Sequence, residues 1–523
     1  MNITGSKRQV QKTPQNFRVL FVYPNMQMSS LAPISIASLS GLLRENGFDV
    51  DLFDTTLYIT PYSTDTNKEK IYLSKVRPFD WQERGIVPKT GDVLMDFGRK
   101  VDEYNPDLIA FTVFENSWMM TDALLNSLRR PVLTIVGGVF ATFAPEVVIG
   151  HPKVDYVCRG EGEWAFLALC KALCAGKSTD NIPNMWVKAE GTILRNAIGK
   201  VQNLDDLPLP DWSIFEKQSL YRPMQGHVWR TIGVETQRGC PFGCAYCNSP
   251  ANAELYKREQ AGKYYRKKSI RRVAAELENA RKSVNPELIY FVTDNLLAMT
   301  DSEFAEFSEM YQDYRIPFWM NTRAETVNER RADGLDIMNC LRMNIGIEHG
   351  NEKFRAEVLD RSVSQATYLK AFRACSGHKF VCVANSMIGF PDETRDLAFD
   401  SIELHRTLPE DIEATGAFIF TPYHGTKLRE RAIRKGYLQP NTICSATVTN
   451  SSILNMPLFA AEAIKGLCRV FSFYTKMPKS RWPEIANAEL FDEMGEMAFQ
   501  KLSNEYNEAY IATSRVQAMP NIE

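Results

Sequence analysis

Residues 237–247 read Gln-Arg-Gly-Cys-Pro-Phe-Gly-Cys-Ala-Tyr-Cys, and this stretch is the most informative part of the 523-residue chain. Its three cysteines, Cys240, Cys244 and Cys247, are spaced by four and then three positions in a loop that two glycines make flexible. Three thiolates in one loop can bind three irons of a cubic iron–sulfur cluster and leave the fourth iron open to a small molecule. The spacing therefore predicts a [4Fe–4S] cluster with one open iron.

The main alternative for this loop is a structural zinc site. Such a site normally shows a fourth Cys or His at short spacing, whereas the nearest candidates here are His227 and Cys340. The remaining cysteines show no ligand spacing; Cys170 and Cys174, for example, lie one turn apart on an apolar helix, which is typical of buried free thiols. We expect no second cluster.

Composition excludes several classes of protein. A chain of 523 residues predicts two or three domains, and 44% hydrophobic with 24% charged residues is typical of a soluble globular protein. The net charge of −2 gives no indication of nucleic-acid binding. The polar N-terminus predicts no signal peptide, and no apolar run predicts a membrane span. Eleven cysteines fit reduced thiols plus one cluster, so we expect a cytoplasmic monomer in a reducing compartment.

The cysteine loop, with Tyr246 directly before the last cysteine, resembles the CxxxCxxC signature of radical S-adenosylmethionine (SAM) enzymes. In that family the open iron binds the amino and carboxylate groups of SAM, and one electron cleaves SAM to a 5′-deoxyadenosyl radical. The resemblance implies that Tyr246 stacks near the adenine. It also implies an electron donor such as flavodoxin or ferredoxin.

The N-terminal part of the chain alternates short apolar runs with helical patterns from Phe17 onward. A helix is predicted at 34–46, and strands are predicted at 18–23, 49–53, 107–113, 132–136 and 154–157. This alternation predicts a parallel, doubly wound (Rossmann-like) sheet whose ligand lies at the carboxyl ends of the strands.

One motif in this region suggests a dinucleotide. Gly160-Glu161-Gly162-Glu163-Trp164-Ala165 matches the Gly-x-Gly-x-x-Ala fingerprint. However, it follows the last predicted strand instead of the first, and its two carboxylates would face the pyrophosphate. We therefore do not expect a dinucleotide here.

The segment after the fourth predicted strand, 137–142, resembles the cobalamin-binding domain that precedes many radical SAM barrels. The resemblance implies that Gly137, Gly138 and Thr142 belong to a cobalamin site, because small residues let a flat macrocycle or its nucleotide tail approach the backbone. Phe140 stands where the family often has histidine. The alternative is a domain that has lost its cofactor and only covers the barrel.

Histidine placement predicts how cobalamin would be held. All six histidines lie at or after His151, so the loop after the first strand lacks the histidine that ligates cobalt in methionine-synthase-type domains. Cobalamin should therefore be bound base-off, without a lower histidine ligand. A weaker axial donor makes methyl transfer to a carbon radical easier. Candidates to pack against that lower face follow the third strand: Glu115, Asn116, Ser117 and Trp118.

A second set of β/α units follows the proline-rich crossing at 205–212. Its predicted strands are 231–237, 288–292, 318–321, 343–347, 381–387 and 417–420. Six such units resemble the partial (β/α)6 barrel of the family, whose chemistry lies at the carboxyl ends of the strands.

Polar residues at these strand ends are the candidate SAM contacts. Asp294 and Asn295 follow the second barrel strand, where the family often has acidic residues, and Arg323 follows the third. Glu348, in a segment like the family's GIExG, is expected to hold the ribose hydroxyls. Arg361 matches a position that often pairs with the methionine carboxylate, a contact that suits guanidinium geometry.

The predicted organisation has four parts. A Rossmann-like cobalamin-binding domain at 1–190 carries an insertion at 57–104, which either caps the substrate or is a surface loop. A linker at 191–230 leads to the radical SAM barrel at 231–436, and a helical C-terminal region at 437–523 is expected to pack over the barrel mouth.

The resemblance implies a cobalamin-dependent radical SAM methyltransferase that methylates an unactivated carbon through a 5′-deoxyadenosyl radical and methylcobalamin. The alternative is oxidative cyclisation or rearrangement by the same two domains without methyl transfer. A third possibility is a cobalamin-bound sensor with a vestigial cluster. The substrate class stays open between a small molecule, a lipid and a peptide, and no catalytic residue is identified.

Overall fold

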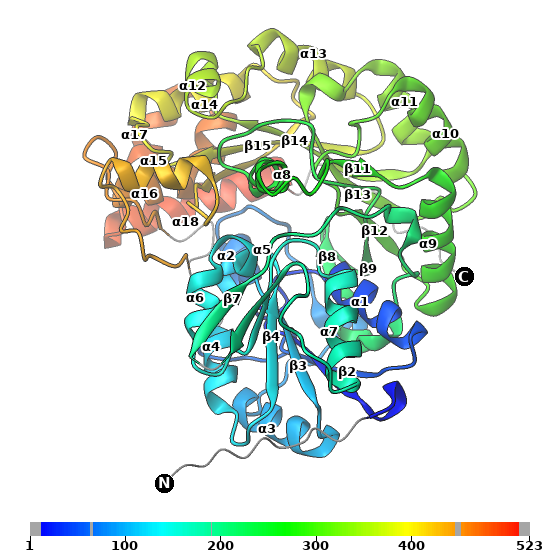
Figure 1. The fold of residues 1–523 in the computed structure, drawn as a ribbon. Coiled ribbons are helices and arrows are strands. Elements are labelled where there is room, and N and C mark those ends of the chain that lie inside the picture. Colours follow the sequence, from blue (N-terminus) through cyan, green and yellow to red (C-terminus); the bar gives the residue numbers. More distant parts are fainter. Residues whose placement is uncertain (1–11, 63–65, 190, 445–450, 512–523) are drawn as a thin grey trace. The chain divides into compact units, whose positions relative to one another are not determined.

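The computed structural model describes residues 12–62, 66–189, 191–444 and 451–511 (Figure 1). The chain forms two compact units, and it passes between them more than once. The first unit comprises Met1–Thr64, Pro88–Ser219 and Leu255–Lys263; the second comprises Asp65–Val87, Leu220–Glu254 and Tyr264–Glu523.

The first unit is built on a seven-stranded sheet in the order β2-β1-β3-β4-β5-β6-β7. Neighbours from β2 to β5 pair in parallel, whereas β6 and β7 are antiparallel additions at one edge. The strands are β1 (Arg18–Tyr23), β2 (Asp49–Asp54), β3 (Leu108–Thr112), β4 (Leu133–Gly137), β5 (Tyr156–Cys158), β6 (Met185–Ala189) and β7 (Thr192–Arg195). The predicted doubly wound parallel sheet is confirmed.

Helices cover this sheet: α1 (Ile34–Glu45), α3 (Val93–Tyr104), α4 (Trp118–Ser127), α5 (Val139–Phe143), α6 (Pro145–Gly150) and α7 (Glu163–Cys174). Helix α1 packs with α7, and α3 packs with α4 (Figure 1). Helix α3 occupies the last part of the predicted insertion. It begins where the Asp92 carboxylate accepts hydrogen bonds from Leu94 and Met95 N–H groups, and it ends at Asn105 in the left-handed region, with φ of 51°.

The second unit is built on a curled sheet in the order β16-β15-β14-β13-β12-β9-β8. Its strands are β8 (Tyr221–Met224), β9 (His227–Val234), β12 (Leu288–Phe291), β13 (Phe318–Thr322), β14 (Cys340–Glu348), β15 (Val381–Ile388) and β16 (Glu413–Ile419). Strands β9 and β12 to β16 run in parallel, which confirms the six predicted barrel strands, and β8 adds an antiparallel hairpin. A short pair, β10 (Gln237–Arg238) and β11 (Arg266–Lys267), lies outside this sheet.

Helices line the outer side of the curled sheet (Figure 1). They are α9 (Ile270–Ser283), α10 (Asp301–Tyr311), α11 (Glu329–Ile337), α13 (Gln365–Cys375) and α14 (Arg395–Arg406). The remaining helices of this part of the chain are α8 (Asn248–Arg258), whose last residues belong to the first unit, α12 (Glu352–Glu357) and α15 (Lys427–Arg434). One of the strands of this sheet, β13, alternates between buried and partly exposed residues. In β13, Phe318, Met320 and Thr322 are buried, whereas Trp319 and Asn321 on the opposite face keep partial exposure. The inner face of the half-barrel is therefore mixed aromatic and polar.

Residues 66–87, here named the crossing segment, pack in the second unit although the chain on either side belongs to the first. The segment begins with α2 (Thr66–Tyr72). Beyond α2, the buried Lys75 side chain lies against β16, where Nζ donates a hydrogen bond to the carbonyl of Ala417 and lies 3.2 Å from Cys468 Sγ. The amine thereby satisfies a carbonyl on the edge strand of the sheet.

Further along the crossing segment, arginines contact other strands of the same unit. Arg77 Nη2 donates to Glu413 Oε1 at 2.9 Å, and Arg84 Nε donates to the carbonyl of Val228 at 2.9 Å. The segment therefore runs from β16, at one edge of the sheet, to the β8–β9 hairpin at the other. Part of the predicted insertion thus spans the two edges of the half-barrel.

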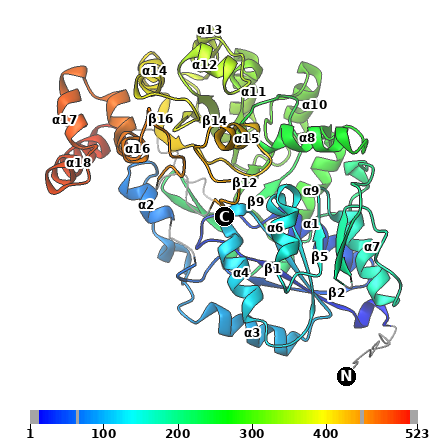
Figure 2. The ribbon, with the colours of Figure 1, turned by 60° about the vertical axis from the view of Figure 1, so that its left-hand side comes forward.

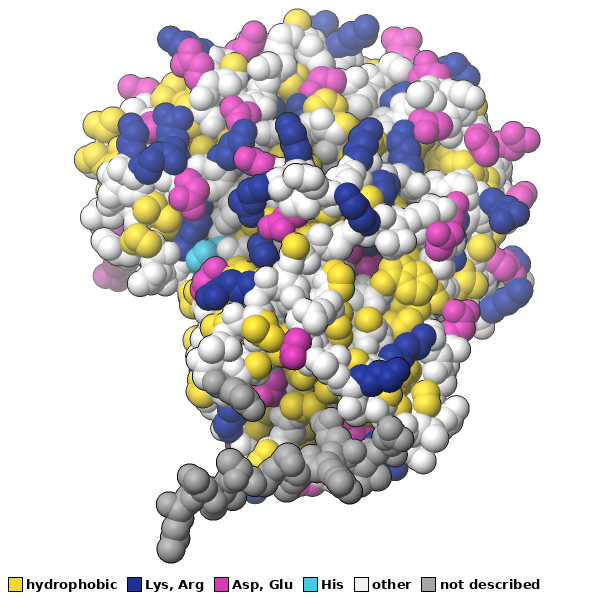
Figure 3. Space-filling model, viewed as in Figure 1, with side chains coloured by type: hydrophobic (Ala, Val, Ile, Leu, Met, Phe, Trp, Pro, Cys, Tyr) yellow, Lys and Arg dark blue, Asp and Glu magenta, His cyan; other side chains and the backbone are white. Residues whose placement is uncertain are grey.

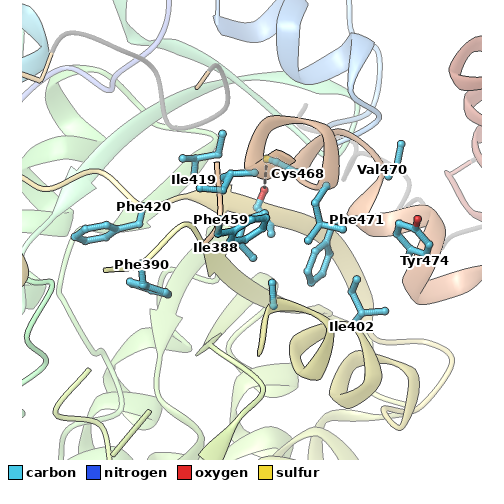
Figure 4. Packing of buried hydrophobic residues seen from close by; sticks show 14 of the residues in the cluster. Ile388, Phe390, Ile402, Ile419, Phe420, Phe459, Cys468, Val470, Phe471 and Tyr474 are labelled. Atoms are coloured by element: carbon cyan, nitrogen blue, oxygen red, sulfur yellow. Dashed lines mark hydrogen bonds between the residues drawn. The ribbon is translucent and has the colours of Figure 1, made fainter. Parts of the chain in front are cut away.

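The C-terminal region adds α16 (Ala461–Lys476), α17 (Trp482–Asn487) and α18 (Glu493–Tyr506), which lie together at one end of the second unit (Figure 2). The apolar face of α16 packs on β16 and α14, and Figure 4 shows Phe471 directed toward Ile402 of α14. Cys468 Sγ donates to the Ala417 carbonyl at 3.2 Å in the same place.

The distribution of charged side chains on the surface agrees with the near-neutral net charge of the chain. On the face drawn in Figure 3, Lys and Arg side chains are interspersed with Asp and Glu. A helix that could cross a bilayer is not found within the described ranges.

Candidate functional site

The cysteine loop lies between β10 and α8 and is tied to the rest of the second unit by its backbone. Ala245 N–H donates to the Leu359 carbonyl at 2.9 Å, and the Ala245 carbonyl accepts from Leu428 N–H at 3.1 Å. The turn at its start requires glycine: Gly239 has φ of +83°, and a Cβ there would lie 2.8 Å from the Tyr264 ring. The loop is thus held in place from both sides.

The three thiols of the loop differ in exposure. Cys244 is buried, and Cys240 and Cys247 are partly exposed. Burial raises the pKa of Cys240 to about 11 and that of Cys247 to about 12, and the nearby Asp294 carboxylate adds to both shifts. A metal must displace these protons in order to bind, so loading of the loop is coupled to proton release.

The chemistry of the loop fits a cluster. Across the described ranges, no three His, Cys, Asp or Glu side chains are grouped so as to hold a single metal ion. A cubic cluster differs because each thiolate binds its own iron. Hydrogen-bond donors to sulfur are present: Ser249 N–H lies 3.4 Å from Cys247 Sγ, and two guanidinium groups approach Cys244.

These two guanidinium groups belong to predicted site residues. Arg323 Nη1 donates to Cys244 Sγ at 2.9 Å, and Arg361 Nη1 lies 3.7 Å from the same sulfur. Arg361 is buried, and its other contacts are the Tyr246 hydroxyl at 3.4 Å and the Tyr368 hydroxyl at 3.0 Å. The structure thereby brings Tyr246, Arg323 and Arg361 together around one cysteine.

Glu348 joins this group through an irregular strand end. The β14–β15 register shifts between Gly346 and Glu348, and Glu348 has φ of 68°, which is uncommon for a residue with a side chain. A Cβ on Gly346 would lie 2.1 Å from Glu348 Oε1, so the carboxylate folds back over that glycine. Arg361 Nη2 donates to the Gly346 carbonyl. Strained backbone of this kind clusters at functional sites.

The two residues after β12 face different surroundings. Asp294 is exposed to solvent and close enough to the cysteines to influence their pKa values. Asn295 is fully buried: its Oδ1 accepts from Thr322 Oγ1 at 2.7 Å, and its carbonyl accepts from Gln237 Nε2 at 2.6 Å. The structure therefore places Asp294 near the cysteine loop, whereas Asn295 forms buried hydrogen bonds that connect the ends of neighbouring strands.

Sequence reasoning missed a buried pair below Glu348. His349 Nε2 lies 3.1 Å from Glu393 Oε1, and neither side chain is exposed. Since His349 Nδ1 accepts from Asn351 N–H at 3.0 Å, the proton of the neutral ring must be on Nε2, facing Glu393. The other oxygen of Glu393 accepts N–H bonds from Gly389 and Phe390. The pair links the ends of β14 and β15, and the glutamate in Gly389-Phe390-Pro391-Asp392-Glu393 was the available signal.

In the first unit, the predicted glycines lie at the carboxyl end of β4. Gly138 has φ of +105°, and a Cβ there would lie 2.6 Å from the Val113 carbonyl oxygen. Gly137 has more room, with 3.7 Å to the Cys158 Cβ. Gly138 thus lets the chain after β4 pass close to the end of β3, where a side chain would clash.

The other predicted cobalamin contacts have internal partners. Thr142 Oγ1 donates to the Gly138 carbonyl and accepts from Gly160 N–H, both at 2.9 Å. Ser117 Oγ bonds both the N–H and the carbonyl of Phe114, at 3.2 and 3.0 Å. These side chains shape the loops around the edge of the sheet.

Trp118 is likewise buried, with its ring 5.5 Å from Phe140 and edge-on to His151. Asn116 beside it keeps partial exposure. Three large apolar residues that sequence reasoning missed are exposed after β3, β4 and β5: Phe114 at 42%, Val139 at 38% and Trp164 at 40%. Their only signal was an apolar residue in the segment that follows a strand: Phe114 and Val139 come two residues after β3 and β4, and Trp164 lies at the start of α7, six residues after β5.

Comparison with known families places both units. The profile of the radical SAM superfamily matches residues 234–404, and that of the B12 binding domain matches residues 87–170. The chain is an enzyme that contains a B12-binding domain and a radical SAM domain. The radical SAM match contains the cysteine loop, Glu348 and Arg361, and the B12-binding match contains 116–118 and 137–142.

A curated relative is similar to most of this chain. The uncharacterized methyltransferase PH0819 of Pyrococcus horikoshii is 27% identical over 76% of this chain and 84% of its own length. Among solved structures, the methyltransferase TsrM of Kitasatospora setae, with tryptophan and a SAM analogue bound, gives a TM-score of 0.59 at 15% identity. That alignment covers 88% of this chain and 84% of TsrM.

The cobalamin-dependent SAM radical enzyme OxsB, with aqua-cobalamin and SAM bound, gives a TM-score of 0.61 at 15% identity. Its alignment covers 95% of this chain and 71% of OxsB. At this level of identity both structures support the fold of a B12-binding domain followed by a radical SAM domain.

Proposed function

We propose that this protein is a cobalamin-dependent radical SAM C-methyltransferase that acts on an unactivated carbon. The observation that carries the proposal is the combination of a three-cysteine loop faced by Arg323, Arg361 and Glu348 with a B12-binding domain in the same chain. The relative from Pyrococcus horikoshii bears the name of a methyltransferase, which favours methyl transfer over rearrangement.

The second unit supplies groups suited to SAM beside the cluster loop. Arg361 can pair with the methionine carboxylate by its planar fork. Glu348, aimed by its bulged strand, can accept the ribose hydroxyls, and the Tyr246 ring can lie along the adenine. When bound, the cluster with SAM supplies a carbon-centred radical, and cobalamin supplies the methyl group. The chain's own residues orient SAM and hold the loop in place.

The first unit supports base-off cobalamin. His151 is its only histidine, and its partners are internal: Nδ1 accepts from Lys153 N–H at 3.2 Å, and Nε2 lies 3.4 Å from Asp122. Burial lowers the pKa of His151. A side chain held in this way behind Trp118 is a poor candidate for the cobalt, so we propose that the lower face is covered without a histidine ligand.

The inner face of the half-barrel is where we propose that the substrate binds. Asn321 Nδ2 donates to the Tyr290 hydroxyl at 2.7 Å, and Asn344 Nδ2 donates to Asn321 Oδ1 at 3.1 Å. The Tyr290 and Trp319 rings stack at 4.1 Å. This lining combines amide groups with flat aromatic surface, which favours a substrate that is both polar and planar over a purely aliphatic lipid.

The first experiment is absorption and EPR spectroscopy of protein purified without oxygen and supplied with cobalamin, iron and sulfide. The expected result is a cluster signal together with a cob(II)alamin signal that lacks nitrogen superhyperfine splitting. A nitrogen-split signal would contradict the base-off proposal. Absence of stoichiometric cobalamin would reduce the first unit to a scaffold.

The products formed from SAM distinguish methyl transfer from cyclisation or rearrangement. A methyltransferase forms S-adenosylhomocysteine and 5′-deoxyadenosine together, whereas cyclisation or rearrangement forms little S-adenosylhomocysteine. An external one-electron donor such as flavodoxin or ferredoxin is required in either case. If a Cys244→Ala variant kept its full function, the protein would instead be a cobalamin sensor.

A further inference from the structure

Arg323 is placed to act on the cluster itself. Sequence reasoning assigned it to SAM because it follows a barrel strand. In the structure its guanidinium lies over the Phe242 ring of the cysteine loop at 3.9 Å, while Nη1 donates to Cys244 Sγ at 2.9 Å. Two independent contacts, one with a ring and one with a sulfur, therefore hold this side chain against the loop.

A carboxylate partner fixes the direction of that guanidinium. Arg323 Nε donates to Glu325 Oε1 at 3.1 Å, and Nη2 donates to the same oxygen. The Arg323 side chain is 9% exposed and that of Glu325 is 27% exposed. Because Glu325 holds one side of the planar group, Nη1 is left directed at Cys244. A hydrogen bond of this kind to a metal ligand tunes the properties of the metal.

We propose that Arg323 is a positioning residue that donates a charge-assisted hydrogen bond to a cluster thiolate and raises the reduction potential of the cluster, with Glu325 moderating its charge. The inference rests on the proposed cluster at Cys240, Cys244 and Cys247. Reduction adds one negative charge to the cluster, and a nearby N–H donor stabilises the reduced form. The role differs from that of Arg361, whose partners include Tyr246 and the Gly346 carbonyl.

The test is an EPR-monitored redox titration of the full-length protein with a reconstituted cluster, without substrate. Arg323→Met keeps the apolar stem but removes the donor, so the midpoint should fall by at least the 59 mV that corresponds to a tenfold change for one electron. Glu325→Gln leaves Arg323 in place without its counter-charge, so the midpoint should rise. Arg323→Lys should fall between wild type and Arg323→Met. Arg342→Gln, which removes an arginine bonded to Glu413 on the inner face, should leave the midpoint unchanged.

Iron content and SAM affinity are measured on the same samples. A wild-type protein that takes up no cluster overturns the proposed function. A wild-type protein with a cluster, and variants with unchanged midpoints, overturns only the role of Arg323. Weakened SAM binding at an unchanged midpoint would show that Arg323 is a SAM ligand instead. If Arg323→Met fails to fold, the direction of the Glu325→Gln shift decides the question.

Discussion

The carboxyl edges of the two parallel sheets are chemically unlike each other. In the second unit, Arg323, Glu348 and Arg361 bring charged groups to the cysteine loop, and one of them stands on strained backbone. In the first unit, polar side chains such as Thr142 bond within the loops, while Phe114 and its neighbours expose apolar surface. Both edges lie at the carboxyl ends of parallel strands, which is where sheets of this kind generally bind ligands.

The comparison indicates that the topology of the sheet determines the position of a binding site, whereas the residues of the loops determine which ligand can bind there. A charged sulfonium compound with a cluster requires fixed charges and hydrogen bonds. A large, flat macrocycle requires close approach to the backbone and apolar surface. Four substitutions test whether the two edges obey these separate requirements.

The largest effect is expected at the cysteine loop. Cys244→Ala removes one of three thiolates, so we expect loss of the cluster and loss of reductive SAM cleavage by at least ~1000-fold, since the barrier reduction depends on the cluster. Iron and sulfide analysis measures this loss directly. Cys340→Ala, a buried cysteine of β14 without a ligand role, is the matched control and should keep the full cluster.

Gly138→Ala should disrupt the carboxyl edge of the sheet in the first unit and leave the carboxyl edge of the sheet in the second unit unaffected. A Cβ would lie 2.6 Å from the Val113 carbonyl oxygen on backbone with φ of +105°, so we expect about 3 kcal/mol of destabilisation. Cobalamin binding should be lost while iron content is kept. Gly191→Ala has a similar positive φ of +83° with no atom within 4 Å, and should cost only about 1 kcal/mol. Thermal unfolding of both variants checks the difference, and equal losses would contradict it.

Glu348→Gln should weaken SAM binding by roughly 10- to 100-fold, because a charged hydrogen bond contributes about 1.5–3 kcal/mol. Equilibrium binding of SAM to cluster-loaded protein is the measurement. Glu357→Gln, on the exposed end of α12, should bind SAM as wild type does. Unchanged affinity in Glu348→Gln would mean that the bulge at the end of β14 serves another purpose.

Ser117→Ala is expected to have the smallest effect. Its hydroxyl caps its own turn, so removal should cost about 1 kcal/mol of stability and leave cobalamin binding unchanged. Asn116→Ala, at the neighbouring part-exposed position, should instead weaken cobalamin binding with little change in stability. If the two results were reversed, Ser117 would belong to the cofactor surface.

Much of the fold follows from local pattern. Apolar runs gave the parallel strands of the first unit, because strands buried on both faces are apolar throughout. In the second unit the strands keep a partly polar inner face, and the recurrence of β/α units indicated them. One prediction had two different outcomes. Asp294 and Asn295 follow β12 in a turn, where Asp294 is exposed near the cysteines and Asn295 is buried, and the sequence does not show which side chain of such a turn faces outward.

Other features depend on partners far away in the chain. Nothing around Arg323 indicates that Cys244 would accept its hydrogen bond, since the two residues are 79 positions apart. The bulge that orients Glu348 depends on the register between β14 and β15. The crossing segment lacks periodicity because its path is determined by contacts with distant strands and with α16. Contacts of this kind cannot be predicted from the residues that neighbour them in the sequence.

The crossing segment also constrains how the protein can be synthesised. Lys75 bonds a carbonyl 342 positions later in the chain, and at about 5–20 residues per second the ribosome needs roughly 17–70 s to reach it. During that time the first sheet can form, whereas residues 66–87 must wait as an unpaired loop between its strands. The half-barrel therefore completes last, when β16 and α16 emerge, and a nascent chain stopped before them would present this loop to chaperones and proteases.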